Sequence, residues 1–290
     1  MIKSFNNDDM NFFPGPDKGN ENFINLIQES SKIICKWFEN SNLNGPLPLN
    51  YDFKASFPNK VPTDNKILFN DIESLINNSF NPVHPGSLAN LDPPPLNISI
   101  IGDFISASLN NNLLAEELSP SLSDLEHSIC NWFASKLGFG NSSGGIAASG
   151  GSLNNLNALV AARINSGLDS DSQATFIISE QAHVSFDKCA KIMGLNETNI
   201  KKIKTDIKGQ MDIESLESTL KKCHFDGKKV FAVVATYGTT FRGAIDPIDK
   251  IINICKKYGI WLHVDASIGG VFKVFGNRIN CSYDLSLVDS

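Results

Sequence analysis

Three short stretches of this chain carry residue types that could hold a charged ligand. The first is the segment Ala-Ala-Ser-Gly-Gly-Ser at residues 147–152, which leads directly into an apolar helical pattern. The second is His183, and the third is His263 with Asp265 two positions further on. A glycine-serine turn at a helix N-terminus presents backbone N–H groups and the positive end of the helix dipole, which suits a phosphate.

Each of these positions also has a structural explanation when it is taken alone. Ser152 could merely cap its helix. Asp265 could be a helix N-cap or one partner of a structural ion pair, and His183 could be a structural histidine. The residue types by themselves leave these alternatives open.

The elements of the C-terminal third are the clearest in the chain. Residues 230–235 form a continuous apolar run, which is typical of a strand buried on both faces of a parallel sheet. Asp246 supplies an N-cap and Pro247 a first helical position, and the helix closes at Gly259. Residues 260–264 form the returning strand. Ligands bind outside the carboxyl ends of strands in open α/β sheets, where this strand delivers its carboxylate.

The preceding segments alternate in the same way. The patterns predict helices over 153–164, 184–194 and 212–222, and strands over 175–179 and 200–203. This alternation predicts an α/β fold with a predominantly parallel sheet. The three stretches are then expected to meet in one crevice. There the glycine-serine turn could bind a phosphate, and the His183 imidazole and the Asp265 carboxylate would suit the ring of a phosphorylated heteroaromatic cofactor.

The front of the chain is less regular. The first twenty residues predict a mobile arm, residues 21–40 and 67–76 predict helices, and residues 44–62 predict a proline-punctuated connection. We interpret residues 1–80 as an arm and helices that pack on a second copy of the same chain.

Residues 81–137 add a loop and two helices to this pattern. Residues 81–95 form a proline-rich loop that could shape a substrate pocket or simply cross the surface. Residues 97–114 predict a helix. A capping box of Ser123 and Glu126 predicts the start of another, whose apolar stripe faces a core. That helix spans 124–137, and its stripe is Leu125, Ile129, Trp132, Phe133 and Leu137.

Composition narrows the class of protein. The formal charge of −6 and the pI near 5.4 give no reason to expect nucleic acid or an anionic membrane as partner. No basic, apolar leader follows Met1 and no apolar run has membrane-spanning length, so we expect a cytoplasmic protein. The six cysteines include no C-x-x-C pair, which indicates free thiols in a reducing compartment and no metal site.

Residues 81–290 resemble the large domain of the pyridoxal-phosphate-dependent group II amino-acid decarboxylases, the family that includes glutamate, aromatic-amino-acid and 2,4-diaminobutyrate decarboxylases. The resemblance is carried, in order, by SGGSLNNLNALVAAR (149–163), SEQAHVSFDKCAKIMG (179–194), ATYGTTFRGAIDPI (235–248) and WLHVDASIGG (261–270). It implies a fold type I domain, with a mainly parallel seven-stranded sheet flanked by helices and its C-terminal part missing. It also implies a homodimer and pyridoxal 5′-phosphate as cofactor.

The resemblance assigns roles to individual residues. It implies that Gly151 and Ser152 bind the cofactor phosphate and that His183 stacks on the pyridine ring. Asp265 would pair with the pyridine nitrogen and keep it protonated, which makes the ring an electron sink. The same resemblance implies roles for four further residues. Thr240 and His263 would lie at the cofactor, and His84 and Pro93 would lie in the substrate loop.

The chain departs from the family at one essential position. The family's Schiff-base lysine lies in an Asn-Pro-His-Lys motif shortly after a stretch that resembles Leu-Ser-Leu-Val-Asp-Ser at 285–290. Lys273, the only lysine after Asp265, lies too close to that strand to match it. We therefore expect a fragment of an amino-acid decarboxylase acting on a 2,4-diaminobutyrate- or glutamate-type substrate. The alternatives are an inactive homologue that acts through dimerisation, and another carbon–carbon lyase or desulfinase of the same fold.

Overall fold

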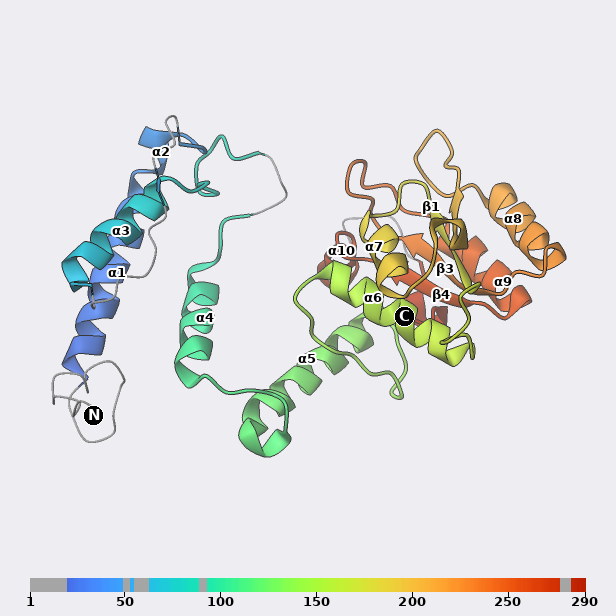
Figure 1. Cartoon of the computed structure of the whole chain (residues 1–290), viewed down its shortest axis with the longest axis horizontal. Helices are drawn as coiled ribbons and strands as arrows, with labels where there is room; N and C mark the ends of the chain where they lie inside the picture. The colour runs from blue at the N-terminus through green and yellow to red at the C-terminus, as the bar shows by residue number, and fades with distance from the viewer. Residues whose placement is uncertain (1–19, 49–52, 55–62, 89–92, 277–282) are drawn as a thin grey trace, which may run out of the picture. The chain divides into compact units, whose positions relative to one another are not determined.

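The structure, a computed structural model, describes residues 20–48, 53–54, 63–88, 93–276 and 283–290. The chain divides into two compact units, Met1–Asn110 and Asn111–Ser290 (Figure 1). This division falls later than the boundary expected at residue 80. The expected boundary separates a part that packs on a partner subunit, residues 1–80, from a part that binds the cofactor, residues 81–290. That division of roles stays a prediction. The predicted N-terminal arm lies outside the described residues.

The first unit contains the three helices expected from the apolar periodicity. They are α1 (Glu21–Glu39), α3 (Asn65–Asn77) and α4 (Asn97–Leu109). A short helix that was not predicted, α2 (Ser41–Asn44), follows α1. The helix α4 ends earlier than the predicted residue 114. Asn110 adopts a left-handed conformation with φ of 46° and ends the helix, because asparagine tolerates that region better than most residues. None of the longer helices α1, α3 and α4 has a buried residue.

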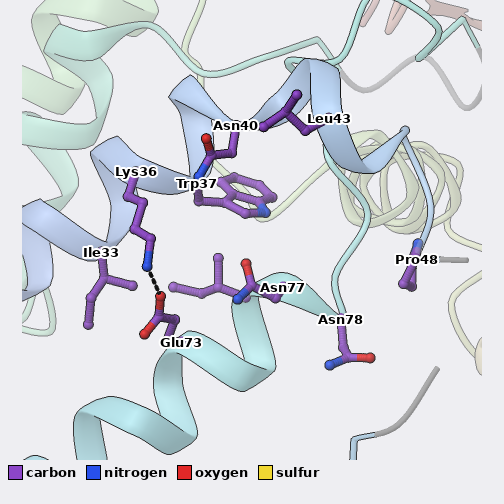
Figure 2. Close-up of a pocket in the computed structure, with 10 residues that line it drawn as sticks. Ile33, Lys36, Trp37, Asn40, Leu43, Pro48, Glu73, Asn77 and Asn78 are labelled. Carbon is purple, nitrogen blue, oxygen red and sulfur yellow. Dashed lines mark hydrogen bonds and ion pairs between the residues drawn. The ribbon is translucent and has the colours of Figure 1, made fainter. Parts of the chain in front are cut away.

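A cavity of about 450 Å³ lies between α1 and α3 of this unit. Figure 2 shows Lys36 of α1 paired with Glu73 of α3 beside it, at a nitrogen–oxygen distance of 2.6 Å. Trp37 lies on the same side of α1. None of the residues predicted to bind a cofactor or substrate lines this cavity.

The second unit is built on a parallel sheet. Its strands are β1 (Thr175–Ser179), β2 (Ile200–Ile203), β3 (Val230–Thr236) and β4 (Trp261–Asp265), in the order β2-β1-β3-β4. Every neighbouring pair is parallel, which confirms the predicted topology. The described residues contribute four strands, whereas the family resemblance implied a seven-stranded sheet.

Helices cover both faces of this sheet, as Figure 1 shows. Side chains alternate along each strand, so Val233 packs with α8 (Ile213–Phe225) and α9 (Ile248–Tyr258). Ala232 and Val234 pack instead with α6 (Gly151–Asn165) and α7 (Ser185–Ile192). Burying one large apolar side chain is worth about 1.5–3 kcal/mol, so two such layers hold the sheet rigidly. The carboxyl ends of its strands are therefore fixed in space.

Asp246 does not cap α9 as its sequence context predicts. The helix begins at Ile248 after Pro247, and the Asp246 side chain is fully buried instead. Its carboxylate accepts hydrogen bonds from the backbone N–H groups of Met211, at 2.7 Å, and Thr236, at 2.8 Å. Burial raises the pKa of this carboxyl to about 6, although both hydrogen bonds oppose the shift. The carboxylate thus ties the end of β3 to the segment before α8.

The helix α5 (Pro120–Leu137) also differs from its prediction. Proline occupies the first helical position after Ser119, so Ser123 lies inside the helix and donates to the Ser119 carbonyl at 2.9 Å. Glu126 accepts from the backbone N–H of Ala147, at 3.0 Å. The predicted capping box is therefore wrong.

The apolar stripe of α5 is not buried in a core either. Leu125, Ile129, Trp132 and Phe133 are 40–53% exposed. Only part of the stripe is covered, where the Trp132 ring lies 5.6 Å from the Phe275 ring of α10 (Gly270–Phe275). Leu137, at the end of the stripe, does pack against the core under α8 and α9.

Replacing Asp246 with alanine should destabilise the second unit. Two buried N–H groups would lose their acceptor, at a cost of about 1–3 kcal/mol each. The folded-state pKa of the wild-type carboxyl is raised, so its contribution is fully present below its unfolded pKa and is lost as the pH rises through about 6. Urea unfolding should therefore show a larger difference between wild type and variant at pH 4.5 than at pH 7.5.

Asp249→Ala is the matched control, because Asp249 is exposed three residues further along. It should change the free energy of unfolding by about 1 kcal/mol or less. Equal effects of the two substitutions, or the opposite pH trend, would contradict the role given to Asp246.

Candidate active site

The predicted site residues of the second unit gather at one edge of the sheet. Asp265 is the last residue of β4, and its register partner on β3 is Thr236. His183 lies between β1 and α7, and Thr240 lies in the turn after β3. Because parallel strands end at the same edge, three separate loops meet there.

The glycine-rich turn approaches this edge closely. Gly151 begins α6, and a Cβ added to it would collide with the side-chain oxygen of Ser267, two residues beyond Asp265. The N-cap, Gly150, offers no side-chain acceptor to the first turn of the helix. The first N–H groups of a helix have no partner within it, so they point out of the helix end beside Ser152, which is exposed.

A cavity of about 720 Å³ opens beside this turn. Ala147, Ala148 and Asn154 line it from the glycine-rich segment and α6, and Ala266 lines it from the residue after β4. The cavity therefore borders both the helix N-terminus and the strand that carries Asp265.

The Asp265 carboxylate is largely buried and held by three donors. One oxygen accepts from the Ser267 backbone N–H at 3.1 Å and from its hydroxyl at 2.8 Å. The other accepts from the Asn155 side-chain amide at 3.0 Å. The next helix, α10, begins only at Gly270, and no ion pair of the described residues involves Asp265. Neither the helix-cap nor the ion-pair alternative describes this carboxylate.

His183 is exposed but its ring is anchored on one side. The Nδ1 atom accepts from the Ser185 backbone N–H at 3.2 Å and lies 2.9 Å from the Ser185 hydroxyl oxygen. The other edge of the imidazole is left for a ligand. Thr240 is exposed as well, whereas the neighbouring Thr239 is buried and accepts from the Ala244 N–H at 3.0 Å.

His263 is buried beside Asn155. It is only 7% exposed, and its Nε2 lies 3.1 Å from the side-chain amide oxygen of Asn155, while its Nδ1 lies 3.0 Å from the Ser290 hydroxyl. Burial lowers the pKa of this imidazole to about 4, although the Asp265 carboxylate opposes the shift. His263 is therefore a neutral ring held by Asn155 and Ser290, and its contact with a cofactor stays a prediction.

Two residues at the centre of the site were missed from the sequence. Asn155 is 3% exposed and Ser185 is 2% exposed, and their side chains are 3.2 Å apart. The spacing of Asn155 from Leu159 and Ala162 does place it on the buried face of α6. A polar residue on an otherwise apolar helix face is the signal that could have identified it.

The predicted substrate-loop residues belong to the other compact unit. His84 accepts from the Gly86 N–H at 2.8 Å within its own turn, and Pro93 is exposed. Their contact with a substrate stays a prediction.

The donor set suits a phosphorylated, nitrogen-containing ring and not a metal. A helix N-terminus with an exposed serine can hold a phosphate, and an exposed imidazole and a fixed carboxylate can hold a ring with a basic nitrogen. The approach of Gly151 to Ser267 leaves no room for a side chain at this point of the cradle. In the described residues no cluster of His, Cys, Asp or Glu could hold a metal ion.

No helix in the described part of the chain is long and apolar enough to cross a membrane.

Gly151→Ala should separate α6 from the segment after β4. The added methyl group would overlap Ser267, and overpacking of this kind costs about 1–3 kcal/mol. Thermal or urea unfolding measures the loss. Gly140→Ala is the control, since nothing lies within 4 Å of a Cβ there, and it should change stability by less than about 0.5 kcal/mol. Equal stability of the two variants would argue against the close approach.

The sequence of this chain matches those of known proteins. Residues 49–278 match the pyridoxal-dependent decarboxylase conserved domain. The chain is 32% identical over 240 residues to an L-2,4-diaminobutyrate decarboxylase of Acinetobacter baumannii, covering 76% of this chain and 47% of that protein. It is 33% identical over 255 residues to the acidic amino acid decarboxylase GADL1 of Xenopus tropicalis, covering 84% and 48%.

Solved structures agree in fold. Mouse CSAD superposes with a TM-score of 0.85 at 23% identity, covering 94% of this chain and 60% of that one. The glutamate decarboxylase domain of a Vibrio parahaemolyticus diaminobutyrate-pyruvate transaminase and L-2,4-diaminobutyrate decarboxylase gives 0.82 at 26% identity, covering 90% and 61%. These matches confirm the predicted fold type I α/β class. With the domain match spanning most of its length, the chain belongs to the pyridoxal-dependent decarboxylase family.

Proposed function

We propose that this chain carries the cofactor-binding part of an enzyme that removes the α-carboxylate of an L-amino acid with pyridoxal 5′-phosphate. The chain spans about half the length of the curated relatives it matches, so the activity belongs to the whole protein that contains it. The observation that carries the proposal is the Asp265 carboxylate, which three donors hold at the carboxyl end of β4.

Each residue has a distinct task in this proposal. The N–H groups of Gly151 and Ser152, with the Ser152 hydroxyl, hold the phosphate. The exposed ring of His183 packs on the pyridine face, and Thr240 lies at its edge. The Asp265 carboxylate accepts a hydrogen bond from the protonated pyridine nitrogen and keeps it protonated. When bound, the cofactor supplies an electron sink for the charge left as carbon dioxide departs.

His263 supports this arrangement from behind. It contacts Asn155 instead of the open edge of the site, and it is neutral because burial lowers its pKa to about 4. A neutral ring here adds no second positive charge to compete with the pyridine nitrogen for Asp265.

The substrate we propose is a 2,4-diaminobutyrate- or glutamate-type amino acid. The names of the two relatives described above support this class. His84 and Pro93 are our candidates for the loop that selects it.

We also propose a cytoplasmic homodimer. The free cysteines of the described residues support a reducing compartment. The net charge of −6 argues against nucleic acid or an anionic membrane as partner. Exposed apolar side chains on α1, α3 and α4 support the packing of the N-terminal helices on a second copy.

Asp265→Ala should weaken the binding of pyridoxal 5′-phosphate by about 10–100-fold, because a charge-assisted hydrogen bond is worth about 1.5–3 kcal/mol. Equilibrium dialysis of residues 1–290 with the cofactor measures this. Asp249→Ala, a change of the same type at an exposed position, should leave the affinity unchanged. Equal affinity of the Asp265 variant and wild type would contradict the proposed site.

Decarboxylation is tested on the whole protein that contains residues 1–290. It should release carbon dioxide from L-2,4-diaminobutyrate or L-glutamate, and Asp265→Ala should lower kcat at saturating cofactor. Release from neither amino acid would contradict the proposed substrate class. After borohydride reduction, no cofactor should be attached to residues 1–290. The Lys273 amine donates to the Tyr283 carbonyl at 3.0 Å. Labelling of Lys273 would contradict our conclusion that it does not match the family's Schiff-base lysine.

A further inference from the structure

The amide of Asn155 connects the two predicted catalytic residues. It is 3% exposed, and its nitrogen donates to Asp265 at 3.0 Å and to the Ser185 hydroxyl at 3.2 Å. Its oxygen faces Nε2 of His263 at 3.1 Å. An ionised carboxylate only accepts hydrogen bonds, so the nitrogen of this amide must be the atom that faces Asp265.

The orientation of the amide then sets the tautomer of His263. The Asn155 oxygen can only accept, so His263 must carry a proton on Nε2. In a neutral ring Nδ1 is then an acceptor, and the Ser290 hydroxyl donates to it across 3.0 Å. The Ser290 oxygen in turn accepts from the indole N–H of Trp261 at 2.8 Å. An indole N–H can only donate, so the Ser290 oxygen accepts from Trp261 and its hydroxyl hydrogen is available for Nδ1 of His263. The contacts of Ser290 therefore agree with the His263 tautomer deduced from Asp265 and Asn155.

A second branch reaches His183. The Ser185 oxygen accepts one hydrogen of the Asn155 amide, which leaves the Ser185 hydroxyl hydrogen free to be donated. The Ser185 backbone N–H donates to Nδ1 of His183, so this nitrogen is an acceptor and takes the hydroxyl hydrogen as well. A neutral His183 therefore carries its proton on Nε2, on the exposed side of the ring.

Only one orientation of the Asn155 amide satisfies all of these contacts. Rotating it by half a turn would bring its oxygen against the Asp265 carboxylate and its nitrogen against the Nε2–H of His263. Both contacts would be repulsive and buried, and buried polar groups left without partners are costly.

We propose that Asn155 is a positioning residue that aims the Asp265 carboxylate and sets the tautomer of His263. Through Ser185 it also orients a hydroxyl toward Nδ1 of His183, which already accepts from the Ser185 backbone N–H. Asn155 acts through these residues and touches no reacting group. The inference rests on the proposed function only in assuming that Asp265 and His183 face the cofactor. The hydrogen-bond chain itself is a property of the protein without cofactor.

Nitrogen-15 NMR of the five histidines in cofactor-free residues 1–290 tests the chain of hydrogen bonds directly. His183→Gln and His263→Gln variants assign the signals. At a pH where the rings are neutral, wild type should show the proton on Nε2 of both His183 and His263. Asn155→Leu, which keeps the volume but removes the amide, should produce a mixture of tautomers at His263. His183 should keep its proton on Nε2, because the Ser185 backbone N–H still donates to its Nδ1. Asn157→Leu is the matched control on an exposed position of the same helix and should leave both tautomers unchanged.

Asn155→Ala is the second variant, used if Asn155→Leu does not fold. It also removes the amide oxygen that faces Nε2 of His263, so it should also give a mixture of tautomers at that ring. Proton on Nδ1 of either ring in wild type, or an unchanged His263 tautomer in both Asn155 variants, would overturn the inference.

The affinity for pyridoxal 5′-phosphate separates this inference from the proposed function. Asn155→Leu should lower the affinity by about 3–30-fold, which is less than the effect of Asp265→Ala because the carboxylate stays in place. If wild type bound no cofactor while the tautomers responded as expected, the proposed function would fail and the hydrogen-bond chain would stand. If wild type bound cofactor while the tautomers did not respond, the inference would fail alone.

Discussion

The hydrogen bonds of the buried Asn155 amide are the contacts on which the rest of the site depends. They join α6 to the end of β4 and to the first residue of α7, three segments that are far apart in the sequence. The glycine-rich turn leads into the same helix, so the N–H groups of that turn are positioned by the same connection. One amide thus relates the glycine-rich turn to the Asp265 carboxylate and, through Ser185, to the His183 imidazole.

The parallel sheet provides the rigid frame for these contacts. Both of its faces are buried under helices, so the ends of β1, β3 and β4 cannot shift independently. Asp246 adds a second connection below the site, since its carboxylate accepts two backbone N–H groups at the end of β3 and before α8. Glycine at 151 then allows α6 to approach the residues after β4.

Burial shifts the pKa values of His263 and Asp246 in opposite directions. It lowers the pKa of His263, so the folded protein loses stability from this residue as the pH falls from about 6.5 towards 4. It raises the pKa of Asp246, whose contribution is instead lost as the pH rises through about 6. Each group favours its neutral form, because a low-dielectric surrounding penalises charge. The site is therefore held together by oriented hydrogen bonds more than by ion pairs.

The sequence by itself determined the type and order of the elements, because strands and helices follow from local periodicity and end at local signals. The run before Thr236, the apolar face of α9 and the cap at Gly259 are of this kind, and so are the motifs that place Gly151, His183 and Asp265. Only the tertiary structure decided which polar side chains meet. Asn155 and Asp265 are 110 positions apart, Asp246 turns inward instead of capping its helix, and His263 lies behind an amide. A local pattern shows that a residue is polar, but its partner is set by packing between distant segments.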